Sequence, residues 1–154
     1  MQQLFIMLTV SVATVTDIPA LIPLLNSLFS QEAEFQPDVN KQTVGLHSIV
    51  TQPHVGAILV AKDTDKLIGM VNILFTISTA QGGLVAILED MVVDPNYRGA
   101  GIGSKLITEV IKFCQSKNIS RITLLTDADN YSAISFYEKH GFAKSPMIPL
   151  RCFI

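Results

Sequence analysis

The residues best suited to chemistry lie between Leu88 and Leu106, where an apolar stretch runs into a glycine-rich loop. The loop carries glycines at three alternate positions, Gly99, Gly101 and Gly103. Glycines let backbone N–H groups approach an anion closely, and a helix expected from about Ile102 adds unpaired N–H donors and the positive end of its dipole. Arg98 stands beside the loop and can donate a charge-assisted hydrogen bond to a phosphate oxygen. The spacing therefore predicts a cradle for a diphosphate.

Two common phosphate loops do not fit this spacing. A dinucleotide fingerprint needs a glycine at its sixth position, and counting from Gly99 that position is Ser104. A mononucleotide P-loop ends in Gly-Lys-Ser/Thr, whereas Gly103 is followed by Ser104 and then Lys105. A nucleotide-phosphate enzyme is therefore disfavoured.

The loop resembles instead the acetyl-CoA loop of the GCN5-related N-acetyltransferase (GNAT) family, Arg/Gln-x-x-Gly-x-Gly/Ala, with Arg98, Gly101 and Gly103 at the matching positions. A second segment, from Asn130 to Phe142, is similar to the family's Asn-x-x-Ala-x-x-Phe-Tyr-x-x-x-Gly-Phe pattern. The resemblance covers residues 55–143, while the first 50 residues and the last ten match only in length and element type. It implies an α/β (α+β) fold with a mixed, mostly antiparallel sheet of six to seven strands and about four helices. Residues 1–154 would form a single domain.

The resemblance also implies two catalytic residues. Glu89, on the strand before the loop, would take the proton from an amine directly or through water, and Asp90 is expected on the opposite face by strand alternation. Tyr137 occupies the family's general-acid position and would hydrogen-bond the departing CoA thiolate. The structural alternatives are that Glu89 pairs with a basic group or caps a loop, and that Tyr137 is a core aromatic residue.

Acetyl-CoA is the cosubstrate that the resemblance implies, held by strand backbone, by the loop and by the second motif. The expected cofactor-binding residues are Met91, Val92, Val93, Arg98, Gly99, Ala100, Gly101, Ile102, Gly103, Ser104, Asn130 and Phe136. Since no serine or cysteine is placed as an obvious nucleophile, we expect direct transfer of the acetyl group to a primary amine. An acyl-CoA-binding sensor that lacks turnover is the alternative from another class.

The segment from Gln31 to Asp38 commonly borders the acceptor site in the family. Its carboxylates, Glu32, Glu34 and Asp38, suit a small cationic or polyamine-like amine, although they also fit a solvated loop. A protein or peptide amine remains open.

Composition adds limits. The net charge of -2 argues against general nucleic-acid binding, and no apolar run reaches the roughly 18 residues of a membrane span. The three histidines, His47, His54 and His140, show no metal-ligand spacing, so no metal is expected. Two cysteines make no disulfide framework, and the opening residues carry no Lys or Arg, which favours the cytoplasm. Because dimers are common in the family, a homodimer is an option.

Periodicity predicts the elements that position these residues. The expected strands are 8–14, 55–62, 66–78, 84–93 and 119–126. The expected helices begin near residues 17, 38, 102 and 130. The tail, 142–154, is expected to supply two short strands broken by Pro146 and Pro149.

Overall fold

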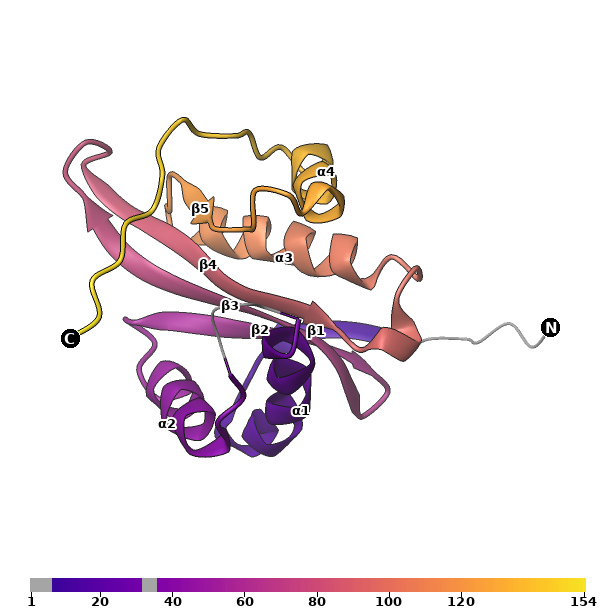
Figure 1. The fold of residues 1–154 in the computed structure, drawn as a ribbon. Coiled ribbons are helices and arrows are strands. Elements are labelled where there is room, and N and C mark those ends of the chain that lie inside the picture. Colours follow the sequence, from indigo (N-terminus) through magenta and orange to yellow (C-terminus); the bar gives the residue numbers. More distant parts are fainter. Residues whose placement is uncertain (1–6, 32–35) are drawn as a thin grey trace.

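The computed structural model describes residues 7–31 and 36–154, which form one sheet with helices on both faces (Figure 1). The strands are β1 (Leu8–Val12), β2 (Gly56–Asp63), β3 (Lys66–Ser78), β4 (Gly83–Val93) and β5 (Ile122–Leu124). The helices are α1 (Ile18–Phe29), α2 (Val39–Val50), α3 (Ile102–Ser116) and α4 (Tyr131–Lys139). Two short 3-10 turns, η1 (Val15–Asp17) and η2 (Pro95–Tyr97), precede α1 and the glycine-rich loop.

The strands follow one another across the sheet in the order β1-β2-β3-β4-β5. The first four are antiparallel to their neighbours, and β5 pairs in parallel with β4. Helix α3 supplies the long connection that a parallel pair needs. The α/β fold class and the four helices agree with the sequence-based expectation, and the described chain holds five strands rather than six to seven.

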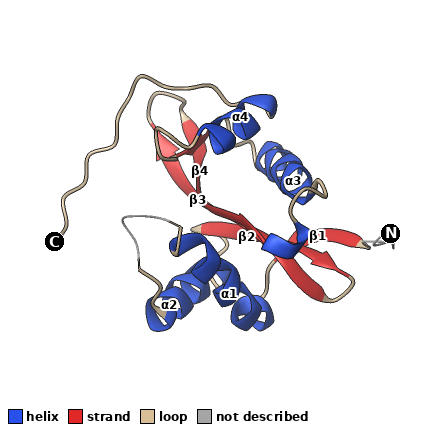
Figure 2. Ribbon diagram, turned by 45° about the vertical axis from the view of Figure 1, so that its right-hand side comes forward, coloured by secondary structure: helices blue, strands red, loops and turns tan. Residues whose placement is uncertain are grey.

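Two apolar cores lie on the two faces of the sheet. Helices α1 and α2 cover one face and α3 and α4 cover the other (Figure 1, Figure 2). The first core packs α3 against the sheet through side chains such as Leu106, Ile107 and Val110, all fully buried. The second core packs α1 through Leu21 and Leu25 against Val60 and its neighbours. Both faces of β2 to β4 are therefore buried, as their long apolar runs require.

The sheet is irregular where β4 approaches the glycine-rich loop. Asn72 of β3 pairs with Asp90 of β4, whereas the next β3 residue, Ile73, pairs with Leu88. Glu89 is therefore an extra residue in β4, a bulge that interrupts strand alternation. Leu88 faces the first core, as do Val71 and Ile73 of β3. Because Asn72 lies between Val71 and Ile73, its side chain faces the opposite side of the sheet. Asp90 is hydrogen-bonded to Asn72 and lies on that same side. Asp90 thus lies on the α1 side of the sheet, and the simple alternation expected for Glu89 and Asp90 does not hold.

The strands β4 and β5 separate at the same bulge. Their pairing runs from Ala86–Ile122 to Leu88–Leu124 and goes no further. Within the described residues, no strand pairs with the outer edge of β4 from Glu89 to Val93. This free edge leads directly into η2 and the glycine-rich loop.

Two expectations for the chain outside the central elements change. The strand expected at 119–126 shortens to Ile122–Leu124, and the tail forms neither of its two expected short strands, because no part of it pairs with the sheet. Glu32 and Glu34 of the expected acidic loop lie outside the described residues. Asp38 caps α2 by accepting a hydrogen bond from the Lys41 N–H, so it serves a structural role.

Candidate active site

A cleft of about 570 Å³ brings together segments that lie far apart in the sequence. It runs from the end of α1, along the free edge of β4 and the glycine-rich loop, to the first turns of α3 and α4. Its lining residues are Leu28, Gln31, Met91, Val92, Val93, Tyr97, Arg98, Gly99, Gly101, Ile102, Gly103, Ser104, Asn130, Ser132, Ala133, Phe136 and Tyr137. All the expected cofactor-binding residues except Ala100 line this one cleft.

The free edge of β4 presents backbone groups to the cleft. The Asp94 N–H donates to the Ile68 carbonyl on the β3 side at 2.8 Å. Alternation along the strand then directs the N–H and C=O groups of Met91 and Val93 away from β3, toward the cleft. The backbone groups of Val92 point toward β3, and its side chain is buried in the second core. Val92 therefore lines the cleft, with its backbone groups directed toward β3.

Two residues of the glycine-rich loop require glycine because of their backbone conformation. Gly99 and Gly101 both adopt φ +80°, a left-handed conformation that side chains disfavour, and Gly101 is the N-cap of α3. Gly103 lies next to Phe136, whose ring a Cβ there would meet at an ordinary van der Waals distance of 3.4 Å. The first N–H groups of α3 have no carbonyl partner within the helix. The loop and helix together can therefore hold an anion such as a diphosphate.

Arg98 links this loop to the strand. Its Nε donates to the Val93 carbonyl at 3.3 Å, while the side chain stays exposed. That bond occupies one donor of the guanidinium and leaves the two terminal nitrogens for an anion. The cationic group is thus held at the junction of the free edge and the loop.

The second sequence motif forms the opposite wall. Asn130 caps α4, since its Oδ1 accepts from the Ala133 N–H at 3.1 Å, and its Nδ2 keeps two donors for other partners. Phe136 packs against Gly103 and contacts Tyr137 edge-on with ring centroids 5.2 Å apart. Helix α4 therefore orients its polar cap and its aromatic pair toward the loop.

Tyr137 directs its hydroxyl at a sulfur atom across the cleft. The hydroxyl donates to Met91 Sδ at 3.6 Å, and the Phe142 ring packs edge-on at 5.4 Å. Desolvation by burial raises the pKa of Tyr137 to about 12. The phenol therefore stays protonated at neutral pH and is a hydrogen-bond donor suited to a sulfur acceptor.

The two carboxylates at the bulge differ in environment. Glu89 is exposed, whereas Asp90 Oδ2 accepts from Asn72 Nδ2 at 3.2 Å beneath α1. Desolvation by burial raises the pKa of Asp90, and the nearby charge of Glu89 raises it further, while the Asn72 hydrogen bond opposes the shift. Asn72 itself is only 5% exposed, and its Oδ1 has no hydrogen-bond partner among the described residues. Neither carboxylate is among the residues that line the cleft, and both lie at the bulge where the free edge of β4 begins.

Sequence reasoning missed four residues of the lining. Ser132 and Ala133 lie within the second motif, and the N-terminal turn of its helix was the signal that could have included them. Tyr97 precedes Arg98 directly, in η2. Leu28 comes from the end of α1, more than 60 residues before the loop, and only the tertiary structure brings it to the cleft. Gln31, which also lines the cleft, is the first residue of the segment expected to border the acceptor site.

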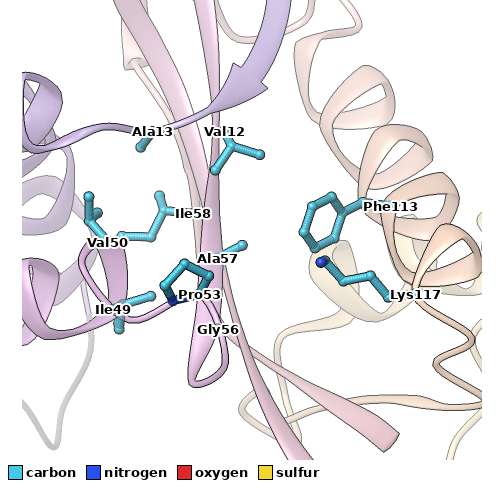
Figure 3. Close-up of a pocket in the computed structure, with 10 residues that line it drawn as sticks. All are labelled: Val12, Ala13, Ile49, Val50, Pro53, Gly56, Ala57, Ile58, Phe113 and Lys117. Carbon is cyan, nitrogen blue, oxygen red and sulfur yellow. The ribbon is translucent and has the colours of Figure 1, made fainter.

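A second cavity, of about 240 Å³, lies between α2, the sheet and α3 (Figure 3). Its walls are apolar, and Figure 3 shows Phe113 and Lys117 facing Val12 and Ala57, while Ile58 lies on the side of Ile49 and Val50. Among the ten described residues that line it, Lys117 is the only charged one, and its Nζ lies 5.1 Å from the centroid of the Phe113 ring. Without carboxylate, imidazole, hydroxyl or thiol groups in that lining it offers little chemistry, and the larger cleft is the candidate site.

Comparison with known proteins identifies the family of this chain. The model of the acetyltransferase (GNAT) family matches residues 20–142, a span that contains the free edge, the loop and α4. The chain belongs to the GNAT family. The expected family is thereby confirmed, and the two segments that resemble the family's motifs both line the cleft.

Individual GNAT relatives match parts of the chain. A glucosamine 6-phosphate N-acetyltransferase of Trypanosoma brucei brucei is 38% identical over 80 residues, which cover 51% of this chain and 52% of the relative. An uncharacterised N-acetyltransferase of Pyropia yezoensis is 36% identical over 81 residues, 53% of this chain and 42% of the relative. The chain thus spans about half the length of these curated relatives or less. Their names establish no acceptor for it.

Solved structures agree over the whole fold. A possible acetyltransferase of Clostridium difficile 630 superposes with a TM-score of 0.86 at 18% identity, covering 96% of this chain and 97% of that one. At this identity the likeness concerns the fold alone. None of the helices within residues 7–31 and 36–154 is long and apolar enough to cross a membrane.

Proposed function

We propose that this protein is an acetyl-CoA-dependent N-acetyltransferase that transfers an acetyl group directly to a small primary amine. The observation that carries the proposal is the position of the free β4 edge, between the glycine cradle and the Tyr137 hydroxyl. The pantetheine amides would pair with Met91 and Val93 as an added strand does, and the diphosphate would lie on the loop at Gly99 and Gly101. A backbone N–H of the same edge would polarise the thioester carbonyl.

The proton of the attacking amine would leave through the carboxylates at the bulge. A lysine-like amine has a pKa of about 10.4, so removing its proton at pH 7 costs roughly 4 to 5 kcal/mol. Glu89 is our candidate base, and its exposure means that the proton would reach it through water. We add Asp90 as a second candidate, because a raised pKa makes a carboxylate a stronger base. We assign the acidic limb of the pH profile of kcat/KM to the ionisation of Asp90. Glu89 would pass the proton of the amine on to solvent.

Tyr137 would stabilise the departing thiolate as a hydrogen-bond donor. With the pKa of Tyr137 near 12, complete proton transfer to a thiolate of pKa about 8.5 would be uphill by roughly 5 kcal/mol. The phenol therefore donates a hydrogen bond to the sulfur and keeps its proton. Its present bond to Met91 Sδ supports this role, because the hydroxyl already points at a sulfur acceptor.

Two carboxylates at the start of the free edge favour a cationic acceptor. The relative from Trypanosoma brucei brucei bears the name of an enzyme for an amino sugar phosphate, so amino sugars belong with polyamines among the candidates. We place the reaction in the cytoplasm, because both cysteines, buried Cys114 and exposed Cys152, are free thiols.

The test combines calorimetry with an assay of thiol release. Acetyl-CoA binding is measured first, and thiol release is then followed with spermidine, glucosamine 6-phosphate, small monoamines, amino acids and a lysine peptide. We expect binding, and release that depends on one class of amine. Binding with no release from any amine would contradict the transferase and favour the sensor. Failure to bind acetyl-CoA would overturn the assignment of the cleft.

A further inference from the structure

Asn72 is a polar side chain in an otherwise apolar part of β3. It is the only polar side chain within residues 68–75, and it is 5% exposed. On its side of the sheet it lies beside two side chains of the second core, Ile58, which pairs with it from β2, and Met70 of its own strand. A buried amide among apolar side chains costs stability unless its polar atoms are hydrogen-bonded. Its presence here therefore needs a reason other than packing.

The hydrogen bonds of Asn72 favour one partner. Its Nδ2 donates to Asp90 Oδ2 at 3.2 Å, and its Oδ1 has no partner among the described residues. An amide can donate two hydrogen bonds and accept two, and buried polar atoms in proteins are generally paired. Asn72 therefore holds Asp90 with one end of its amide and keeps an acceptor available at the other.

The carboxylate that Asn72 holds lies next to the cleft. Val92, two residues beyond Asp90 in β4, belongs to the second core and lines the cleft together with Leu28 of α1. Side chains two residues apart on a strand lie on the same face, roughly 7 Å from each other. Asp90 is also partly exposed, whereas Asn72 is buried. Asp90 can therefore exchange a proton with a group at the α1 side of the cleft.

Few charges act on Asp90. Helix α1, which packs over this part of the sheet, has no titratable side chain from Ile18 to Phe29, and the neighbouring positions of β2 and β3 hold apolar side chains. Burial raises the pKa of Asp90, the hydrogen bond from Asn72 lowers it, and the charge of Glu89 raises it. Asn72 thus keeps Asp90 ionised at a lower pH than burial alone would allow.

We propose that Asn72 is a positioning residue for acetyl transfer, an inference that rests on the proposed function. Its Nδ2 holds the carboxylate of Asp90 beside the cleft, and its Oδ1 accepts a hydrogen bond from a water that carries the proton of the amine. Asp90 and Asn72 Oδ1 supply the two polar partners that such a water needs. The proton leaves the amine nitrogen and ends on the carboxylate, and Asn72 keeps its own hydrogens throughout.

Asn72→Leu tests this inference, because leucine has a similar volume and removes both ends of the amide. We expect kcat/KM at pH 6 to fall at least about tenfold, while the dissociation constant of acetyl-CoA stays within about twofold. The acidic limb of the kcat/KM profile should move to higher pH, since the lost hydrogen bond had lowered the pKa of Asp90. Asn72→Asp keeps the shape, loses the donor and adds a like charge, so its limb should move in the same direction. The two variants disturb the core differently, so poor folding of one does not decide the test.

Carbon-13 NMR of the aspartate carboxyl groups measures the same ionisation without turnover. In the wild-type chain the pKa of Asp90 should lie above the ordinary carboxyl value of 3.8, and it should rise further in Asn72→Leu. A merely structural role of Asn72 would change the melting temperature and leave the acidic limb in place. The shift of the limb is thus the decisive measurement.

Gln42→Leu is the matched control. Gln42 is 7% exposed, its Nε2 donates to Asn26 Oδ1 at 2.9 Å, and its Oε1 has no partner among the described residues. This amide links α2 to α1 instead of joining two strands. Its replacement should change the melting temperature as the loss of a buried amide does, and should leave the acidic limb and the pKa of Asp90 unchanged.

An acidic limb that stays in place in both Asn72 variants would overturn the inference. The same holds for a limb that moves equally in Gln42→Leu, and for a pKa of Asp90 that does not respond to Asn72→Leu. A wild-type chain that binds acetyl-CoA but releases no thiol would contradict the proposed function and this inference together. That failure is seen before any substitution is made, so the two failures are distinguishable.

Discussion

Burial at Tyr137 acts in the same direction as its proposed task. A phenol that donates to sulfur must keep its proton, and a pKa of about 12 ensures this over the whole working range. Phe136 and Phe142 hold the ring edge-on from two sides, so the hydroxyl has little freedom to turn away from the cleft. The shift in pKa and the orientation have the same origin in the packing of α4.

Tyr137→Phe should lower kcat by one to three orders of magnitude and leave the dissociation constant of acetyl-CoA within about twofold. The ring packing survives this change, so only the donor is lost. Steady-state kinetics and calorimetry measure the two effects. Tyr131→Phe, on the same helix but 72% exposed, is the matched control and should keep full activity. Unchanged turnover in the Tyr137 variant would remove this residue from the mechanism.

Asp90→Asn should remove the acidic limb of the kcat/KM profile. In the native protein that limb is expected above the ordinary carboxyl value of 3.8, because burial raises the pKa of Asp90. A raised carboxyl pKa also means that the ionised form destabilises the fold at neutral pH, so this variant should unfold at the same temperature or higher at pH 7. Asp65→Asn, in an exposed turn, is the control. A limb that persists in Asp90→Asn and disappears in Glu89→Gln would assign it to Glu89 alone.

The roles proposed for Glu89 and Asp90 could not be predicted from the sequence. Strand alternation places two neighbours on opposite faces only where the ladder is regular. The extra residue at Glu89 is visible only in the register of β3 against β4. By contrast, the residues that follow the bulge, such as Arg98 and Gly101, were predictable because their backbone requirements are local.

At the scale of elements, the glycine-rich loop and the start of α3 act as one unit. Gly101 both ends the loop and caps the helix in a left-handed conformation. Its neighbourhood is open, since a Cβ added there would meet no described atom within 4 Å. The requirement for glycine therefore comes from the backbone conformation and from space reserved for a ligand.

Gly101→Val should cost about 1–2 kcal/mol of stability through left-handed strain and should weaken acetyl-CoA binding at least 100-fold. Gly82→Val is a matched control, because Gly82 also has positive φ (+74°) and open space but lies in the turn between β3 and β4. It should show the same loss of stability with normal binding. Chemical denaturation and calorimetry separate the two effects. Equal binding losses in both variants would mean that strain, not the cradle, explains the result.

The elements themselves were largely predictable, with one instructive failure. Helices α1 to α4 begin within a residue or two of their expected starts, because capping residues and apolar periodicity are local signals. The tail has the alternation of a strand in the sequence and yet forms none, because a strand needs a partner edge as well as a pattern.

At the scale of the whole molecule, a single sheet separates and joins two cores. Strands β2, β3 and β4 contribute side chains to both, for example Leu59 to the first and Val60 to the second. Because both cores use the same strands, unfolding of the sheet disrupts both cores at once. The sequence predicted the helices but could not say which face each one covers, since that depends on the register of the strands.

Leu21→Ala should therefore destabilise the entire domain, although Leu21 lies in the core opposite to α3. Truncating this fully buried side chain of the second core should cost about 2–5 kcal/mol. Urea unfolding followed by circular dichroism and by loss of acetyl-CoA binding should give one coincident transition at a lower midpoint. Val44→Ala, exposed on α2, should leave the midpoint unchanged. Binding that persists after the α1 side has unfolded would show that the two cores are independent.

The separation of β4 from β5 also gives the protein a built-in reporter of occupancy. Amide hydrogens of Met91 and Val93 point away from β3, so in the free chain deuterium should replace them quickly. Those of Asp90 and Val92 lie in the ladder with β3 and should be protected throughout. A cosubstrate seated on the edge would slow the first pair and leave the second unchanged. The exchange rates of alternate residues in one strand would then report, without any attached label, whether the cleft holds a ligand.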